Sequence, residues 1–348
     1  MESIRLTQFS PGAGCGCKIS PAELHHILEE SRPGNGKVEE YPDLLVGYDS
    51  SDDAAVYDIG GGKAVISTTD FFTPIVNDPF DFGRIAATNA ISDVYAMGGS
   101  PLMAISILGW PLDVLPAAVA GKVVEGARLI CSKAGIPLAG GHSINSTEPI
   151  FGLAVTGIIE KELIRKNNSV RQGDGLYLTK PLGIGLISTG IKKGLASREH
   201  IRTAISLMTR LNAEGPRLAL LKDVHAITDV TGFGLLGHCL EMVDGGSFIA
   251  RIDVNRVPFI PGIETYITQD CIPGGTHRNF ASYKNRISFS PEDNTITVGL
   301  SNGGHLPHRI RCLLCDPQTS GGLLIAADPA AGEQLEKDFG VVCIGEIR

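Results

Sequence analysis

Long apolar stretches are absent from this sequence, since no run approaches the ~20 apolar residues that a membrane-spanning helix needs. Residues 1–20 also lack the basic start and apolar centre of a secretory signal. Cysteine is scarce, with 8 residues in 348, which is too few for a disulfide scaffold. These absences predict a cytoplasmic protein with reduced thiols and no membrane partner.

Basic clusters are absent as well. The chain has 30 Lys and Arg against 38 Asp and Glu, a formal net charge of −8, and no run of basic residues stands out. Proteins that bind nucleic acids need a basic surface to meet the phosphate backbone, so we expect no nucleic-acid partner. A nucleotide is not excluded, because metal ions and backbone amides can hold its phosphates.

Glycine is abundant, with 43 residues, or roughly 12% of the chain against an average near 7%. No collagen-like period accompanies it, and charged residues make up 20%, so neither a fibre nor a disordered chain fits. Tight turns, or backbone that closely approaches a ligand, explain the glycine better. With 43% hydrophobic residues, the chain can bury a sizeable core.

Strand and helix patterns alternate after a loose, glycine-rich segment at residues 1–40. In a first domain over 41–160, the patterns predict elements in turn at 64–69, 81–97, 101–109, 115–134 and 150–159. Such alternation indicates an α/β (α+β) fold in which helices cover a sheet. A polar linker leads to a second α/β domain over 170–348, in which residues 283–306 are polar and fit no element.

Aspartates lie in marked places, at Asp52, Asp53, Asp70, Asp93 and Asp229. Asp70 ends a predicted strand, and Asp93 lies in a predicted helix four residues after Asn89, hence on the same face. Magnesium takes one or two carboxylates together with phosphate oxygens, so the set indicates metal and phosphate binding. Each aspartate alone is more typical of a turn or a helix cap.

Glycine-containing segments at 139–143, 231–238 and 318–322 could present backbone amides to phosphate. None matches a Walker loop or a strand–GxGxxG–helix fingerprint, so ordinary turns are the alternative. Residues 232–237 open a predicted helix, which favours anion binding there.

The motif Cys15-Gly16-Cys17-Lys18 is the most distinctive local feature. Its glycine lets the thiols approach a ligand closely, and Lys18 could lower a thiol pKa or neutralise a phosphate. A loose terminal tail is the alternative.

A second group of soft ligands is His305, His308, Cys312 and Cys315, whose spacings could serve zinc. Cys312 and Cys315 flank two leucines, however. We therefore interpret them as ordinary buried thiols and expect no stoichiometric zinc.

Taken together, these motifs resemble the selenophosphate synthetase (selenide, water dikinase) family, within the aminoimidazole-ribonucleotide-synthetase-like superfamily. The Cys-Gly-Cys-Lys element is the most specific part of the resemblance, which runs in order from residue 4 to about 345. The segments that carry it are 14–18, 52–56, 68–72, 89–93, 140–143, 228–234 and 315–322.

The resemblance implies a two-domain homodimer in which the N-terminal sheets form a shared barrel. It implies the reaction ATP + selenide + H2O → selenophosphate + AMP + phosphate, which supplies selenium for selenocysteine and selenouridine. It further implies Mg2+, with more than one ion per site, a monovalent cation such as K+, and a selenium-delivery protein as partner. Two alternatives stay open: another ATP-dependent enzyme of the superfamily with a different acceptor, and a non-catalytic, thiol-based carrier of selenium or metal.

The resemblance also assigns site residues. The reactive thiol falls on Cys15 and the essential lysine on Lys18. The Mg2+ ligands fall on Asp53, Asp93 and Asp229. The ATP contacts fall on Lys18, Ser50, Ser51, Asp52, Asp70, Asp93, Gly141, His142 and Ser143.

Cys15, rather than Cys17, is expected to be needed for turnover, because the resemblance places the reactive position there. We expect Cys15→Ser to bind magnesium-ATP but to lose selenophosphate formation by orders of magnitude, each tenfold loss being about 1.4 kcal/mol of barrier. Cys17→Ser should keep most activity, whereas Lys18→Ala should lose most of it through missing phosphate stabilisation. Selenide-dependent AMP production measures all three variants, and near-normal output from Cys15→Ser would remove that thiol from the mechanism.

Overall fold

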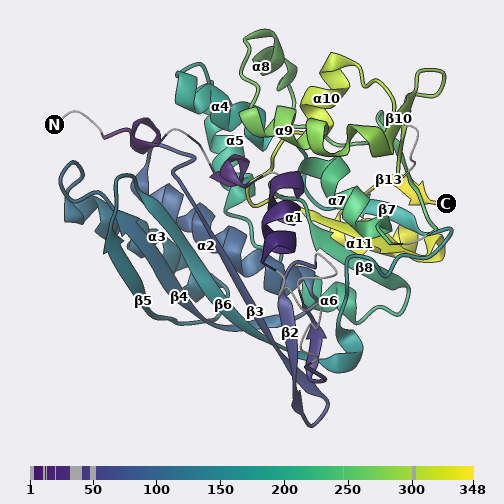
Figure 1. Ribbon diagram of the computed structural model, residues 1–348, viewed down its shortest axis with the longest axis horizontal. Coiled ribbons are helices and arrows are strands. Elements are labelled where there is room, and N and C mark those ends of the chain that lie inside the picture. Colours follow the sequence, from purple (N-terminus) through teal and green to yellow (C-terminus); the bar gives the residue numbers. More distant parts are fainter. Residues whose placement is uncertain are drawn as a thin grey trace.

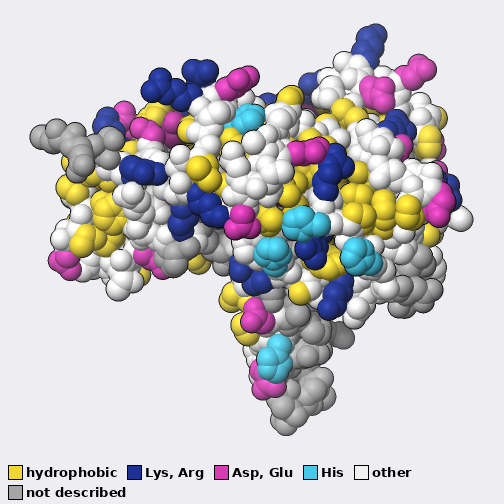
Figure 2. Space-filling model, turned by 90° about the horizontal axis from the view of Figure 1, so that it is seen from above, with side chains coloured by type: hydrophobic (Ala, Val, Ile, Leu, Met, Phe, Trp, Pro, Cys, Tyr) yellow, Lys and Arg dark blue, Asp and Glu magenta, His cyan; other side chains and the backbone are white. Residues whose placement is uncertain are grey.

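The computed structural model describes residues 4–10, 12, 14–19, 21–31, 41–47, 52–245, 247–299 and 303–348. Within these residues the strands form two sheets, and Figure 1 shows the two halves of the chain side by side, the first in purple to blue and the second in teal to yellow. Among the described residues, every helix is too short or too polar to span a membrane. On the face drawn in Figure 2, basic and acidic side chains are interspersed.

The first sheet has the strand order β1-β2-β3-β6-β4-β5. Its pairs are antiparallel except for β4 with β5, which run parallel. Helices α2 (Pro79–Ala96) and α3 (Ala117–Lys133) cover one face. The strands are β1 (Leu44–Val46), β2 (Ala55–Gly60), β3 (Lys63–Phe72), β4 (Ser100–Trp110), β5 (Leu138–Asn145) and β6 (Ile150–Glu160). The five elements predicted over 64–159 are therefore confirmed, and β5 is an additional strand that the patterns did not predict.

Strand β3 and helix α2 form for local reasons that the sequence makes visible. Alternate side chains of β3 are buried, such as Ile66 and Phe72, because they face the helices. Helix α2 begins after Asp78, whose side chain accepts a hydrogen bond from a first-turn amide, and Pro79 occupies its first position. It ends before Gly98, which has a φ of 83° and allows the left-handed turn into β4.

The opposite face of the first sheet exposes large apolar side chains. They are between 45% and 59% exposed and come from β2, β3, β4 and β5: Tyr57, Ile59, Phe71, Leu102, Met103, Ile105 and Ile144. A contiguous apolar surface of this kind usually marks an interaction site.

The second sheet has the order β10-β11-β9-β13-β7-β12-β8, and its ladders are antiparallel. Strand β12 lies between β7 and β8 and is buried along its whole length, which explains its continuous apolar sequence. The strands are β7 (Gly175–Leu178), β8 (Val224–Asp229), β9 (Ala250–Asp253), β10 (Ile287–Ser290), β11 (Thr295–Val298), β12 (Leu323–Ala327) and β13 (Val342–Ile347).

The helices of the second half gather mainly on one side of this sheet in Figure 1. They are α4 (Ile184–Lys193), α5 (Arg198–Met208), α6 (Gly215–Ala219), α7 (Gly234–Val243), α8 (Glu264–Thr268), α9 (Gly274–Tyr283), α10 (His308–Leu314) and α11 (Gly332–Phe339). The polar stretch 283–306, for which the sequence predicted no element, contains the hairpin β10–β11 at the sheet edge. A short edge hairpin tolerates polar residues because one side stays in water.

The N-terminal segment forms short helices rather than sheet. It contains the 3-10 helices η1 (Leu6–Phe9) and η2 (Gly14–Cys17), followed by α1 (Pro21–Glu30). In the view of Figure 1, α1 is drawn in front of the boundary between the two halves.

Two glycines allow α2 and α3 to pack closely. A Cβ added at Gly83 of α2 would lie 1.8 Å from the Val123 carbonyl oxygen, and one added at Gly126 of α3 would lie 2.0 Å from the Phe80 carbonyl oxygen. Backbone therefore meets backbone at this crossing, and side chains larger than hydrogen would force the helices apart.

Gly83→Ala is expected to lower the free energy of unfolding by about 3 kcal/mol, because the helix pair must separate. The matched control is Gly121→Ala on α3, where an added Cβ meets nothing within 4 Å. Alanine should stabilise that position by about 0.5–1 kcal/mol through helix propensity. Urea unfolding followed by circular dichroism measures both, and a Gly83→Ala protein as stable as wild type would contradict the packing argument.

Candidate active site

Carboxylates from both halves meet where the two sheets adjoin. Asp70 lies on β3, Asp93 on α2 and Asp229 at the end of β8, while Asp53 precedes β2. Thr228 Oγ1, next to Asp229, donates a hydrogen bond to Asp53 Oδ1 at 3.0 Å, which joins positions 175 residues apart. The three predicted metal ligands, Asp53, Asp93 and Asp229, therefore lie near enough for their charges to repel one another.

Asp53 and Asp229 keep buried oxygen atoms without a partner. The Oδ2 atoms of both residues are buried and accept no hydrogen bond from the described residues. Burial, and then the charges of Asp229 and Asp93, raise the pKa of Asp53 well above its ordinary value. Burial likewise raises the pKa of Asp229, although a hydrogen bond from Ser92 opposes the shift.

Asp93 and Asp70 are better supplied with hydrogen-bond donors. Thr68 Oγ1 donates to Asp93 Oδ2 at 2.5 Å, and Asn89 Nδ2 donates to Asp70 Oδ2 at 2.5 Å. Burial, followed by the charges of Asp70 and Asp229, still raises the pKa of Asp93 well above its ordinary value. Lys18 Nζ lies 3.6 Å from Asp70 Oδ1.

This donor set suits a cation that binds through few protein ligands. Buried, mutually repelling carboxylates with unsatisfied oxygens gain most from a positive ion. In the described ranges, no group of three or more His, Cys, Asp or Glu side chains is arranged to hold a metal ion. Phosphate oxygens and water would have to complete the coordination, as they commonly do for magnesium.

Lys18 lines a cavity beside these carboxylates. The cavity has a volume of about 360 Å³ and is lined by Gly14, Lys18 and Ile19, by residues 69–73 of β3 and its following turn, and by Ile150. Asp70 faces the same cavity. The backbone of Cys15 and Cys17 lies in η2, but their side chains are outside the described residues, as are Ser50 and Ser51.

Asp52 has a structural partner. Its Oδ1 accepts a hydrogen bond from the backbone N–H of Asn167 at 2.8 Å. Asn167 is buried and belongs to the connection between the two sheets. Asp52 therefore ties that connection to the loop that carries Asp53, and its assignment to ATP stays a prediction.

Gly141, His142 and Ser143 lie apart from the carboxylates within one chain. The alternative that residues 139–143 form an ordinary turn is wrong, because they lie in the edge strand β5. The strand register pairs residues in a row across four adjacent strands, in the order Asp70, Leu153, Ser106 and Gly141. Three strand spacings separate its ends by about 14 Å.

The backbone conformation and close packing at position 141 require glycine, and His142 points to the opposite face of the sheet. Gly141 has a φ of 153°, and an added Cβ would lie 2.2 Å from the Ser106 carbonyl oxygen. The next row contains His142, Ile107 and Phe71, so His142 lies on the exposed apolar face. The nucleotide role of residues 141–143 stays a prediction.

The two other glycine segments lie side by side at the junction. The backbone N–H of Gln318 donates to the Thr231 carbonyl at 2.9 Å, and that of Ser320 donates to Asn89 Oδ1 at 2.7 Å. Gly234, with a φ of 70°, begins α7 as predicted. Segments 231–238 and 318–322 therefore contact each other, and 318–322 also contacts α2 beside Asp93.

Uncharged residues that orient the carboxylates were not predicted from the sequence. Asn212 Nδ2 donates to Ser92 Oγ at 2.8 Å and to the Gly321 carbonyl at 3.0 Å. Ser92, Thr68 and Thr228 then donate to Asp229, Asp93 and Asp53, respectively. Thr228 could have been predicted from one signal, its position directly before an aspartate at a strand end. No feature of the sequence indicated Asn212.

The group of soft ligands His305, His308, Cys312 and Cys315 is divided in the structure. Cys312 Sγ lies 3.7 Å from His308 Nε2, one helical turn away on α10. Cys315 is fully buried and shares a hydrogen bond with Tyr283, and burial raises its pKa to about 12. The absence of zinc stays a prediction that elemental analysis can test.

Known proteins resemble this chain over nearly its full length. Residues 51–159 match the family described as AIR synthase related protein, N-terminal domain, and residues 171–346 match the corresponding C-terminal domain. Selenide, water dikinase of Photobacterium profundum is 54% identical over 331 residues, covering 95% of this chain and 90% of that protein. Selenide, water dikinase of Escherichia coli (strain K12) is 53% identical over 351 aligned residues, covering 99% and 95%.

Solved structures share the architecture at low identity. Thiamine monophosphate kinase from Aquifex aeolicus aligns with a TM-score of 0.63 at 16% identity, covering 95% of this chain and 96% of that one. Hydrogenase maturation protein HypE in complex with ATP aligns with a TM-score of 0.56 at 17% identity, covering 88% and 82%. At such identities the likeness shows the fold alone.

Asp53→Asn should have opposite effects on stability without and with ligand. Because its pKa is raised in the folded state, Asp53 destabilises the folded protein at neutral pH; this penalty shrinks as pH falls below the folded-state pKa and is gone below the ordinary carboxyl pKa. The neutral amide removes that penalty, so the melting temperature should rise in metal-free buffer. The further increase on adding magnesium and ATP should shrink, because one cation ligand is lost.

The matched control is Asp58→Asn. Asp58 pairs with Lys161 at 2.6 Å, and this hydrogen bond lowers its pKa, so the amide should give no increase in melting temperature. Its response to magnesium and ATP should equal that of wild type. Scanning fluorimetry measures both variants, and a full ligand response from Asp53→Asn would contradict the cation assignment.

Proposed function

This chain belongs to the AIR synthase related family and, within it, to the selenide, water dikinases, and from that premise we propose that it makes selenophosphate. The reaction is ATP + selenide + H2O → selenophosphate + AMP + phosphate. The observation that carries the proposal is the identity of 53–54% to selenide, water dikinases over nearly the whole chain. The product would supply selenium for selenocysteine and selenouridine.

Asp53, Asp93 and Asp229 are the proposed ligands of Mg2+. Their support is the pair of buried, unpartnered oxygens and the mutual repulsion that a divalent cation would relieve. When bound, more than one Mg2+ would offset the charge of the triphosphate and align its γ-phosphorus. A monovalent cation such as K+ and a selenium-delivery protein are carried over from the family resemblance alone.

Lys18 is proposed to stabilise phosphate charge. Its ammonium lines the cavity beside Asp70, and its side chain is 37% exposed, so a phosphate could reach it. Cys15, three residues earlier, is proposed to receive or position selenium. The hydrogen bond that Asn89 donates to Asp70 holds this carboxylate beside Lys18, within the proposed ATP site.

The chemistry is proposed to occur in two stages. Selenide attacks the γ-phosphorus of ATP, so that a selenium–phosphorus bond forms while the bond to the bridging oxygen breaks and ADP leaves. Water then attacks the β-phosphorus of ADP, and AMP and phosphate are released. The N-terminal segment would exclude water from the first stage, because water would otherwise compete with selenide for ATP.

A homodimer is part of the proposal. The exposed apolar face of the first sheet would be covered by the same face of a second copy, forming the shared barrel. Residues 141–143 lie at the edge of that sheet and would belong to a site completed by the partner. We propose the domain limits 41–160 and 170–348, with 1–40 as the catalytic N-terminal segment.

One assay tests the proposal against its alternatives. The purified chain is incubated with magnesium and ATP, with and without selenide, and the nucleotides are separated. We expect selenide-dependent AMP in equal amount to phosphate, and none when magnesium is omitted. ADP as the only final product would favour another superfamily enzyme, and absence of turnover would favour a carrier.

A further inference from the structure

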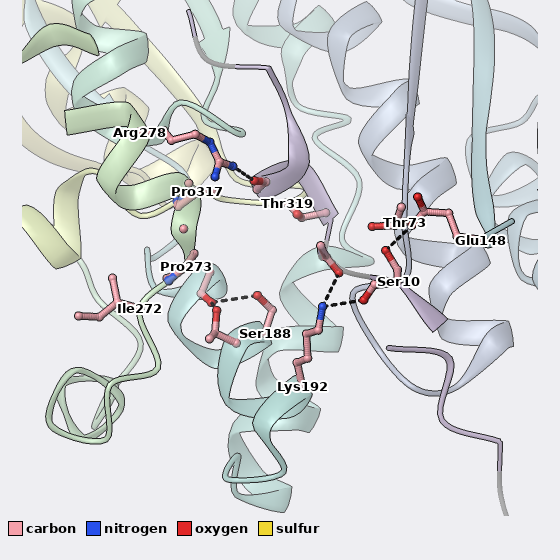
Figure 3. Close-up of a pocket in the computed structure, with 16 residues that line it drawn as sticks. Ser10, Thr73, Glu148, Ser188, Lys192, Ile272, Pro273, Arg278, Pro317 and Thr319 are labelled. Atoms are coloured by element: carbon pink, nitrogen blue, oxygen red, sulfur yellow. Dashed lines mark hydrogen bonds between the residues drawn. The ribbon is translucent and has the colours of Figure 1, made fainter. Parts of the chain in front are cut away.

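A cavity of about 500 Å³ lies where the N-terminal segment crosses the second half of the chain. We call the described residues between 4 and 19 the N-terminal strap. Figure 3 shows the cavity between the strap and helices α4 and α9, with Lys192 and Arg278 pointing toward strap backbone. Neither basic residue belongs to the site described above.

Lys192, in the last turn of α4, binds the strap through main-chain oxygens. Its Nζ donates to the Ser10 carbonyl at 2.7 Å and to the Gly12 carbonyl at 3.0 Å. The adjacent Lys193 points elsewhere, because its Nζ donates to the Asp270 carbonyl at 2.5 Å. Of these two neighbouring lysines, only Lys192 therefore contacts the strap in the described part of the chain.

Arg278, on α9, binds the strap further along. Its guanidinium donates to the Gly16 carbonyl at 2.6 Å, between Cys15 and Cys17. Lys192 and Arg278 thus hold carbonyl oxygens on both sides of Cys15.

The first half of the chain holds the same strap independently. The Ser10 hydroxyl donates to Glu148 Oε2 at 2.8 Å, and the Gly14 N–H donates to the Thr73 carbonyl at 3.1 Å. Leu6 is fully buried in the core. Ser10 is therefore tied to both halves, with its hydroxyl to one and its carbonyl to the other.

The part of the strap after Ser10 depends on these donors because it is rich in glycine. Glycine stands at positions 12, 14 and 16, and glycine segments lose much backbone freedom on ordering. Hydrogen bonds from charged donors are stronger than neutral ones, so two basic groups can hold backbone that sparse packing would not. Lys18, two residues after Gly16, is then held 3.6 Å from Asp70.

We propose that Lys192 and Arg278 are positioning residues that hold the strap, and with it Cys15 and Lys18, at the carboxylate site. The inference rests on the proposed function for its effect on turnover. Its structural part, the attachment of the strap, does not depend on that function.

Hydrogen–deuterium exchange tests the attachment without any substrate. In Lys192→Met and Arg278→Met, peptides covering residues 6–19 should exchange several-fold faster than in wild type, while peptides from β3 and α2 stay unchanged. The matched controls are Lys193→Met on the same helix, and Arg309→Met, whose guanidinium pairs with exposed Glu264. Both controls should leave strap exchange at the wild-type rate.

Steady-state kinetics tests the positioning role. Each variant should lower kcat of selenide-dependent AMP formation by about ten- to a hundredfold, as expected when a reacting group is misplaced, with little change in KM for ATP. Lys192→Arg and Arg278→Lys keep a charged donor and should restore most of the loss. The double variant should lose less than the product of the single losses, because both residues hold one segment.

The outcomes separate the inference from the function. If strap exchange and kcat of the Met variants equal those of wild type, the attachment is wrong. If exchange rises while kcat is unchanged, or if the conservative variants fail to restore kcat, the positioning role is wrong. Wild-type protein without selenide-dependent AMP would overturn the proposed function, and the positioning role with it, while exchange still tests the attachment.

Discussion

The structure depends on burying several carboxylates at the junction of its two halves. Taking an ionised carboxylate out of water is costly unless hydrogen bonds or an opposite charge compensate it. Thr68 and Thr228 each donate one hydrogen bond, yet the Oδ2 atoms of Asp53 and Asp229 stay buried without a partner among the described residues. The fold therefore holds a cluster that a cation would stabilise, in keeping with the proposed site for a metal-bound triphosphate.

Helix α2 fixes the positions of the carboxylates, because it packs in the core and also contributes side chains to the cluster. Its apolar positions, such as Ile85 and Ile91, are fully buried in the core. The same helix supplies Asn89, whose amide nitrogen donates to Asp70 of the first half and whose amide oxygen accepts from the Ser320 N–H of the second. Displacing α2 would therefore disturb both halves of the cluster together, so core packing maintains the site geometry.

Sequence patterns could predict the parts whose causes are local. The pattern of residues 64–69 predicted strand β3, and a polar pair in an otherwise apolar helix indicated Asp93 and Asn89 as site residues. The strand position of Gly141 could not be predicted, since a glycine pair suggests a turn equally well and its need for glycine arises from contact with Ser106. The hairpin within 283–306 was missed because its short apolar alternation lies among polar residues.

Contacts between basic side chains and main-chain oxygens cannot be predicted from sequence patterns. They nevertheless matter for the site, because they do not neutralise its carboxylates. Lys180 is buried, which lowers its pKa to about 7, and its Nζ donates to the carbonyls of Arg210 and Ser320 at 2.7 and 3.0 Å. Lys192 and Arg278 likewise donate to carbonyls of the strap. An ammonium placed on Asp53 or Asp229 would instead neutralise that carboxylate and occupy the position of a metal ion. Because carbonyl oxygens carry no net charge, these bases order the loops around the site and leave its negative charge available to a cation.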